Sequence, residues 1–345
     1  MGKTESTAAA VKSSTIKFIT FTDVHLSSTN PSSRKGSYED DIFNKLEQIK
    51  LVGKKLEVDF FICAGDLFNL KAPMRNPHEL NSKLITLFKS YPAPIYTTEG
   101  NHDLRNDSYE TFCEQPLNVI YASDALIQAR NIRKTINGLS VRIRSIPFEE
   151  APDLSKIERA KDDVDASIFI LHLYATPDGG MLFKNKLYSY KEISALKDDI
   201  FVLGHYHVDQ GIQVIDGILG KKQTFINIGA ISRGALTEED TSRHPKIALV
   251  TITKENGSVS IESDVIRLKV KAVDEAFDIV VHEREKKEQK EAQEFVSKLQ
   301  AEMIEAPKED RITEEISELN LDKLVLDKVN FFLTEAYLQR KAIEE

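Results

Sequence analysis

The sequence predicts an α/β fold, more closely an α+β sandwich, in which two mixed β-sheets face each other and helices flank them. Two observations support this prediction. In the first third of the chain, short apolar runs alternate with amphipathic helical patterns, which is typical of a parallel sheet covered by helices. Further strand-like runs continue through the second half of the chain, so a second sheet is expected opposite the first.

The first third predicts three strands and two helices. Buried strands are expected at 15–22, 59–64 and 93–98, because these runs are rich in β-branched and aromatic residues. The segment Tyr38–Leu56 places Ile42, Leu46 and Ile49 at helical spacing and has acidic residues in its first turn. The segment Pro77–Ser90 shows the same apolar spacing, which predicts a second helix.

The middle of the chain favours strands over helices. The segment Val119–Ile146 is interpreted as hairpins with a turn at Asn137-Gly138, a pair of residues that tight two-residue turns favour. Four more strands are expected at 168–173, 200–204, 224–228 and 247–253, and Asn256-Gly257 predicts another tight turn.

The end of the chain changes composition from Glu283 onward. Lys, Glu and Gln dominate there, and three apolar stripes repeat at helical spacing, the third containing Phe331, Phe332 and Tyr337. We therefore expect a flexible N-terminal extension at 1–14, a main domain at 15–265 and a helical C-terminal region at 266–345. The third stripe needs a surface to cover it: a partner protein, a second copy or the main domain itself.

Composition narrows the class of protein. The chain has 345 residues, of which 41% are hydrophobic and 29% charged, so collagen-like and disordered classes are excluded. No apolar run approaches the ~20 residues of a membrane span, and Met1–Ser14 lacks the apolar core of a secretory signal. Two cysteines predict free thiols and a cytoplasmic protein. The net charge of −9 gives no global attraction to nucleic acid, so such contact needs a local basic face or a metal.

Five short polar strings follow predicted strands. They are Asp23-Val24-His25, Gly65-Asp66-Leu67-Phe68, Gly100-Asn101-His102-Asp103, His172 and Gly204-His205-Tyr206-His207. A phosphodiester is an anion, and two adjacent divalent ions stabilise both its attacking and its leaving oxygen. Such a pair needs nitrogen and oxygen ligands, which imidazole and carboxylate supply for manganese, iron or zinc. The glycines before Asp66, Asn101 and His205 predict tight turns at the strand ends.

Together these strings resemble the five motifs of the calcineurin-like metallophosphoesterases. The resemblance implies a di-metal site at the carboxyl ends of the strands, with two divalent ions that the family suggests are Mn²⁺. Asp23, His25 and His207 would hold one metal, and Asn101, His172 and His205 the other. Asp66 would bridge the two. His102 would be the general acid, held in place by Asp103.

Within that superfamily, the sequence resembles the SbcD-type nucleases over roughly residues 16–266. This group includes the meiotic-recombination-eleven nuclease and related phage recombination subunits. The resemblance rests on Gly65–Phe68 with Pro73 after it, on Tyr96–Asp103, and on Asn227–Arg233. Some members have His where this chain has Asn69. Asn69 and Arg105 are the expected substrate contacts, and other basic residues near the strand ends are expected to meet phosphates: Arg34, Lys35, Lys71, Arg75 and Arg233.

These features predict a manganese-dependent exonuclease or endonuclease subunit for DNA recombination and repair. The resemblance implies DNA, as double-stranded ends or single strands, and an SbcC-type ATPase as partners, together with a homodimer and no membrane. A cyclic-nucleotide or other small-molecule phosphodiesterase is the alternative, and it predicts no partner. A non-catalytic scaffold with the same fold is a further alternative, but it predicts eroded ligands, whereas this sequence keeps all of them.

Overall fold

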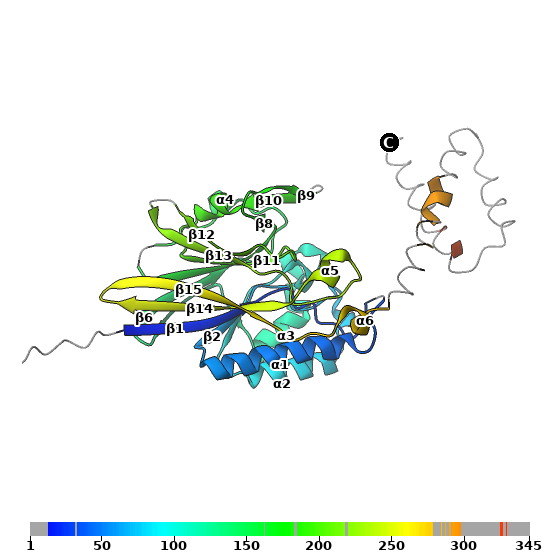
Figure 1. The fold of residues 1–345 in the computed structure, drawn as a ribbon, viewed down its shortest axis with the longest axis horizontal. Helices are drawn as coiled ribbons and strands as arrows, with labels where there is room; N and C mark the ends of the chain where they lie inside the picture. The colour runs from blue at the N-terminus through cyan, green and yellow to red at the C-terminus, as the bar shows by residue number, and fades with distance from the viewer. Residues whose placement is uncertain are drawn as a thin grey trace, which may run out of the picture. The chain divides into compact units, whose positions relative to one another are not determined.

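Two six-stranded sheets form the frame of the unit that spans Met1–Ala276 (Figure 1). The computed structural model describes residues 13–31, 33–161, 163–182, 185–217 and 220–278, and beyond them 284, 287, 290, 292–297, 325, 326 and 329. A second unit spans Phe277–Glu345.

The first sheet has the strand order β15-β14-β1-β2-β3-β4. Its parallel part is formed by β1 (Ser13–Phe21), β2 (Phe60–Cys63), β3 (Ile95–Thr97) and β4 (Ile127–Gln128). The antiparallel strands β14 (Lys246–Glu255) and β15 (Ser258–Arg267) extend it beyond β1. The crossovers carry α1 (Tyr38–Leu56), α2 (His78–Lys89) and α3 (Pro116–Ala122).

The second sheet has the strand order β12-β13-β11-β7-β6-β5. Its centre is parallel and consists of β6 (Leu139–Ser145), β7 (Ala166–Leu173), β11 (Ile200–His205) and β13 (Lys222–Asn227). The edge strands β5 (Asn131–Ile136) and β12 (Gly211–Asp216) are antiparallel to their neighbours. The remaining strands and α-helices are β8 (Ala175–Thr176), β9 (Gly180–Leu182), β10 (Asn185–Ser189), α4 (Tyr190–Ser194), α5 (Glu238–Ser242) and α6 (Val273–Ala276).

The two-residue period of the strands sorts apolar side chains into layers. Ile16 and Phe18 of β1 lie in the core between the sheets, where they meet Ile168 and Ile170 of β7. The outer face of the second sheet, including Phe169 and Phe201, packs against residues of α4 and β10 in a separate cluster. Because the central strands are buried on both faces, they hold the carboxyl ends of both sheets in fixed positions.

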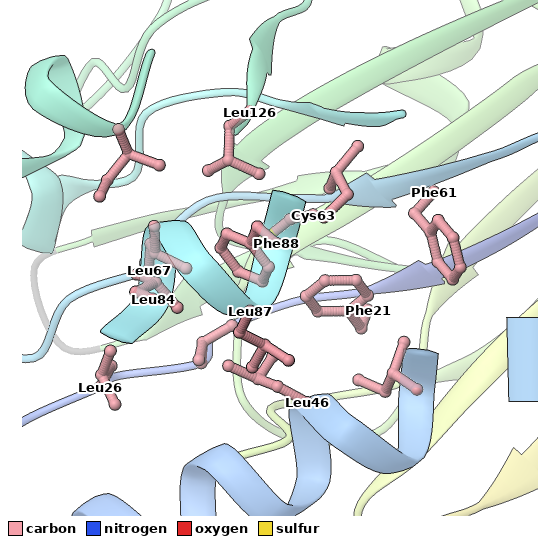
Figure 2. Close-up of a cluster of buried hydrophobic side chains, with 14 of the residues drawn as sticks. Phe21, Leu26, Leu46, Phe61, Cys63, Leu67, Leu84, Leu87, Phe88 and Leu126 are labelled. Carbon is pink, nitrogen blue, oxygen red and sulfur yellow. The ribbon is translucent and has the colours of Figure 1, made fainter. Parts of the chain in front are cut away.

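The other face of the first sheet packs against its helices. Phe21, Phe61 and Cys63 point to this side and meet Leu46 of α1 and Leu84 of α2, as Figure 2 shows. The apolar face of α1 follows from the spacing seen in the sequence, and Ser37 caps the helix by accepting from the amide of Asp40. Helix, sheet, sheet and helix therefore form successive layers in this unit (Figure 1).

Most predicted elements are confirmed. The helix over Tyr38–Leu56 has the predicted bounds, and the turn at Asn137-Gly138 joins β5 to β6. The prediction of strands from Val119 was wrong, because Pro116–Ala122 is the helix α3 with Pro at its first position. The first strand begins at Ser13, inside the segment expected to be an extension. Strand β15 was not predicted, since most of its residues are exposed.

The apolar stripes expected after Glu283 lie largely outside the described residues. Residues 292–297 are helical, and in the second unit Val329 is buried against Phe295, Val325 and Leu326. Among the helices that the structure describes, none combines the length and the apolar character that crossing a bilayer requires.

Candidate metal centre

The predicted ligands come together at the carboxyl edge of the two sheets. Asp23 and His25 follow β1, and Asp66 follows β2. Asn101 begins a short 3₁₀ turn after β3, which spans Asn101–Asp103. From the second sheet, His172 lies in β7, and His205 ends β11 two residues before His207. The strand ends of both sheets therefore contribute to one site.

The backbone at this edge is unusual. Asp23, His25, Asp66 and His205 have φ values of 52°, 47°, 50° and 83°. Residues other than glycine seldom adopt this left-handed region, although Asp, Asn and His do so more readily than most. Clusters of such residues are typical of functional sites, where the surrounding structure holds them in place.

Hydrogen bonds between the loops supply this support. The amides of Asp23 and His25 donate to the carbonyls of Gly65 and Asp66 at 3.3 and 3.0 Å. The buried Asp103 carboxylate accepts from the amides of Leu67, Phe68 and Gly100 at 3.0 to 3.2 Å. These bonds hold the ligand loops after β1, β2 and β3 together.

The side chains form two adjoining groups of potential metal ligands. Asp23, His25, Asp66 and His207 make one group, and Asp66, His172 and His205 make the other, each with its donor atoms within 4.8 Å of one another. Asp66 belongs to both groups, as expected of a bridging ligand. The amide oxygen of Asn101 lies 3.3 Å from His172 Nε2, next to the second group.

The donor set fits divalent cations. The Nε2 atoms of His25 and His207 lie 2.9 Å apart, and His25 Nδ1 is buried without a hydrogen-bond partner in the described part of the chain. His172 Nδ1 is 2.7 Å from the carbonyl of Ala64, which suits donation from Nδ1–H and turns Nε2 toward Asp66, 3.3 Å away. Convergent imidazole nitrogens and carboxylates are the ligands that transition metals prefer.

Electrostatics keep two of these imidazoles neutral. Burial lowers the pKa of His25 well below its usual value, and burial together with His172 lowers the pKa of His205 to about 3. Burial opposes the charge on His172, but the nearby Asp66 raises its pKa to about 9. Burial likewise opposes the Asp66 carboxylate, yet His172, His25 and His102 lower the pKa of that group. The Asp66 carboxylate therefore favours positive charge in both groups of potential ligands.

Two glycines make this geometry possible for different reasons. Gly65 has φ +91°, as the predicted turn requires. Gly100 has φ −90°, a value open to any residue, but a Cβ there would lie less than 3.0 Å from the carboxylate and amide of Asp66. Glycine is therefore required at position 100 because it leaves space for Asp66. The tight turn that was predicted there does not explain this requirement.

The predicted catalytic pair has different partners from those expected. The ring of His102 lies 4.7 Å from that of His25, and its Nδ1 is 2.7 Å from the backbone carbonyl of Asn69. The Asp103 carboxylate accepts from backbone amides. The contact that orients the His102 ring is the one with the Asn69 carbonyl. Arg105 is exposed and lies 3.4 Å from Glu114.

Two of the basic residues expected to meet substrate phosphates are buried instead. Arg34 pairs with Asp41, and Arg233 donates to the carbonyl of Asp240 at 2.9 Å. Both line a cavity beside α1.

Three residues that contact the predicted ligands were not predicted. Thr22 donates to Asp23 Oδ2 at 2.7 Å, and its place directly before the first motif was an available signal. Tyr174 and Phe148 pack on the ring of His205 with centroid distances of 3.8 and 5.2 Å. Phe148 lies far from any motif, so nothing in the sequence indicated its role.

Comparisons with known proteins agree with this geometry. The family model of calcineurin-like phosphoesterases matches residues 16–209. A curated relative from Saccharolobus solfataricus, the DNA double-strand break repair protein Mre11, is 26% identical over 159 residues. The match covers 43% of this chain and 40% of the relative, so the chain aligns with less than half of that protein's length.

Two solved structures are also similar. A Staphylococcus aureus protein described as a candidate 5′-nucleotidase, in complex with α-ketoglutarate, has a TM-score of 0.47 and 15% identity, covering 79% of this chain and 58% of its own. The calcineurin-like phosphoesterase YfkN from Bacillus subtilis has a TM-score of 0.46 and 11% identity, covering 74% and 91%.

The family match spans more than half of the chain and includes every predicted motif. The His/Asp cluster that such enzymes need is assembled at the strand ends. This chain belongs to the calcineurin-like phosphoesterases, a family of metal-dependent hydrolases, as the sequence predicted.

Proposed function

We propose that this phosphoesterase is a nuclease that hydrolyses phosphodiester bonds at DNA ends, with Mn²⁺ in its two metal positions. The complete set of donors around Asp66, with His102 beside it, carries the proposal. The similarity to the Mre11 protein of Saccharolobus solfataricus supports DNA as the substrate, because that relative is named for double-strand break repair.

The two ligand groups would each hold one ion. Asp23, His25 and His207 would serve the first, Asn101, His172 and His205 the second, and Asp66 both. Ions bound there supply Lewis-acid stabilisation of the phosphate oxygens and activate water. The side chains themselves would hold the ions at the edge where both sheets end. The contact between His172 Nδ1 and the Ala64 carbonyl suits the tautomer that turns Nε2 toward this site.

We assign to His102 the role of the general acid that protonates the leaving oxygen. Its Nδ1 lies 2.7 Å from the Asn69 carbonyl, which suits donation from Nδ1–H and fixes the orientation of the ring. A ring that also carries a proton on Nε2 would donate that proton to the leaving oxygen. General acid catalysis of this kind contributes typically ~10²–10⁴-fold to the rate.

The test is the hydrolysis of labelled linear double-stranded DNA and of bis-p-nitrophenyl phosphate with added Mn²⁺. His102→Ala should lower the rate on DNA by about 10²-fold or more. His244→Ala, which removes an exposed imidazole outside the motifs, is the matched control and should leave the rate unchanged. DNA left intact while the small diester is cleaved, with or without an ATPase partner, would favour the small-molecule phosphodiesterase instead.

We further propose an SbcC-type ATPase as the partner and a homodimer as the working state. The apolar stripe near Phe332 and Tyr337 in the sequence supports a partner surface in the C-terminal region. Co-purification with a candidate ATPase, compared between the full chain and a variant with Phe332→Glu and Tyr337→Glu, tests this. Equal co-purification of the two forms would contradict it.

A further inference from the structure

A cavity of about 550 Å³ lies beside α1, away from the metal ligands. Its lining is dominated by positive charge: five basic side chains and two acidic ones, namely Arg34, Lys45, Arg233, Lys269 and Lys271 with Asp41 and Glu275. Asp41, Asn44, Lys45 and Gln48 contribute from one face of α1, and the segment 269–276 forms another wall.

Burial concentrates this charge. Arg34 has a side chain that is only 3% exposed, while Lys45 and Arg233 are 5% and 4% exposed. The one buried carboxylate in the lining, Asp41, is shared between Arg34 and Lys271. Buried charges are normally paired, and the described lining holds five basic side chains but two acidic ones.

Lys45 shows the imbalance most clearly. Its ammonium donates to the carbonyl of Ile231 at 2.9 Å, and within the described ranges it has no carboxylate at ion-pair distance. Burial, together with the neighbouring Arg34, lowers its pKa to about 7. An anion in the cavity would supply the negative charge that this position lacks.

The cavity is separate from the metal centre. The amide of Ile231 donates to the carbonyl of Thr22 at 3.1 Å, and that of Ser232 donates to the carbonyl of Asp23 at 3.3 Å. One layer of backbone thus stands between Lys45 and the first metal ligands. A molecule bound in the cavity would not touch the metal ligands themselves.

We propose that this cavity binds a small phosphate-bearing anion, of which a nucleoside phosphate or inorganic phosphate is the source. Arginine and lysine are the side chains that recognise phosphate, and here they converge from α1, from the loop before it and from the segments 231–234 and 269–271. A volume of about 550 Å³ is in the range of small-molecule sites and exceeds the needs of one phosphate ion.

The test measures binding to the metal-free full chain, so that metal-bound phosphate does not contribute. Inorganic phosphate, AMP and ATP are titrated by calorimetry, with adenosine as the phosphate-free probe. We expect saturable binding of at least one of the phosphate compounds and none of adenosine. Stronger binding of AMP or ATP than of inorganic phosphate would identify a nucleoside phosphate as the source, and equal binding would identify the phosphate group alone.

Two variants locate the binding. Lys45→Met removes the buried ammonium and keeps most of its volume, and Lys269→Glu reverses an exposed charge at the rim of the cavity. Each should weaken binding by about tenfold or more. Asp66→Asn alters the metal centre and should leave this binding unchanged. Should Lys45→Met fail to fold, Lys269→Glu decides alone, because its side chain is exposed.

The proposal is overturned if phosphate, AMP and ATP all fail to bind at millimolar concentration. It is equally overturned if binding survives Lys269→Glu undiminished, or if Asp66→Asn abolishes it, since the anion would then occupy the metal centre.

Discussion

The hairpin turns and the metal edge share left-handed backbone but differ in their surroundings. At the hairpin turns Asn137-Gly138 and Asn256-Gly257, φ lies between 49° and 85°, and the residues are exposed. At the metal edge, Asp23, His25 and Asp66 adopt similar φ values but are buried. The hairpins have Asn and Gly, which such turns favour. The metal edge has Asp and His, which metal binding requires.

The difference shows where conformational cost is tolerated. A residue in a sparsely populated backbone region costs about 1–3 kcal/mol unless its surroundings hold it there. At the metal edge the hydrogen bonds between the loops after β1 and β2, and the acceptor Asp103, hold it. At the metal edge the strained residues are predicted metal ligands, whereas the hairpins place Asn and Gly, which adopt this region at little cost, at their turns.

The largest expected effect comes from removing the shared ligand. Asp66→Asn keeps the shape of the side chain but removes the charge that both ligand groups share. The rate of bis-p-nitrophenyl phosphate hydrolysis should fall by about a thousandfold or more, since Lewis-acid stabilisation contributes several kcal/mol. Asp264→Asn, at an exposed position of β15, is the matched control and should retain full activity. A rate for Asp66→Asn within tenfold of the wild type would contradict the shared role.

A pair of glycine substitutions tests the comparison directly. Gly100→Ala has no backbone strain but no room, because its Cβ would overlap Asp66. Gly257→Ala has open space around its Cβ but a φ of +85°. Gly100→Ala should lose activity and about 1–3 kcal/mol of stability, while Gly257→Ala should lose only about 1 kcal/mol and remain active.

Diester hydrolysis and urea unfolding of both variants provide the measurements. Equal losses of activity would mean that the two regions do not differ in the way described. Full activity of Gly100→Ala would show that Asp66 has room to move without loss of function.

A smaller effect, on stability, is expected from Lys45 in the cavity beside α1. Its buried ammonium has a backbone carbonyl as its hydrogen-bond partner, whereas the buried histidines of the metal centre face carboxylates. The pKa of Lys45 falls from its usual 10.5 to about 7 in the folded chain, so between these values the unfolded chain binds more protons. The contribution of Lys45 to the free energy of unfolding of the protein should therefore become more favourable to the folded state as pH increases from about 7 toward 10.5.

Lys45→Met removes this contribution. The stability of the variant relative to the wild type should be greatest near pH 7 and should shrink as pH rises toward 10. Urea unfolding of both proteins at pH 7, 8 and 9 checks the trend. A constant difference across that range would show that Lys45 remains protonated in the folded chain.

Much of the fold was predictable because local and tertiary preferences agree. The strands that became β1, β2 and β7 are continuous apolar runs, and the spacing of Ile42, Leu46 and Ile49 is that of a buried helix face. The helix α3 was missed because its β-branched residues suggested a strand, although Pro116 at its start was a helix signal.

The candidate site was predictable as a set of ligand types but not in its supporting contacts. Asp, His and Asn at strand ends indicated a metal centre, since parallel strands bring their carboxyl ends to one edge. The supporting contacts depend instead on loop geometry: the partners of Asp103, the Asn69 carbonyl beside His102, and the burial of the Arg34 and Arg233 side chains. One-dimensional spacing does not contain that information.

Metal stoichiometry tests the central claim most directly. Equilibrium dialysis of the full chain against Mn²⁺, followed by elemental analysis, should give two ions per chain for the wild type. Asp66→Asn should lose at least one of them, because both ligand groups share that carboxylate. A wild type that binds no more than one ion, or an Asp66→Asn variant that retains both with unchanged affinity, would contradict the account.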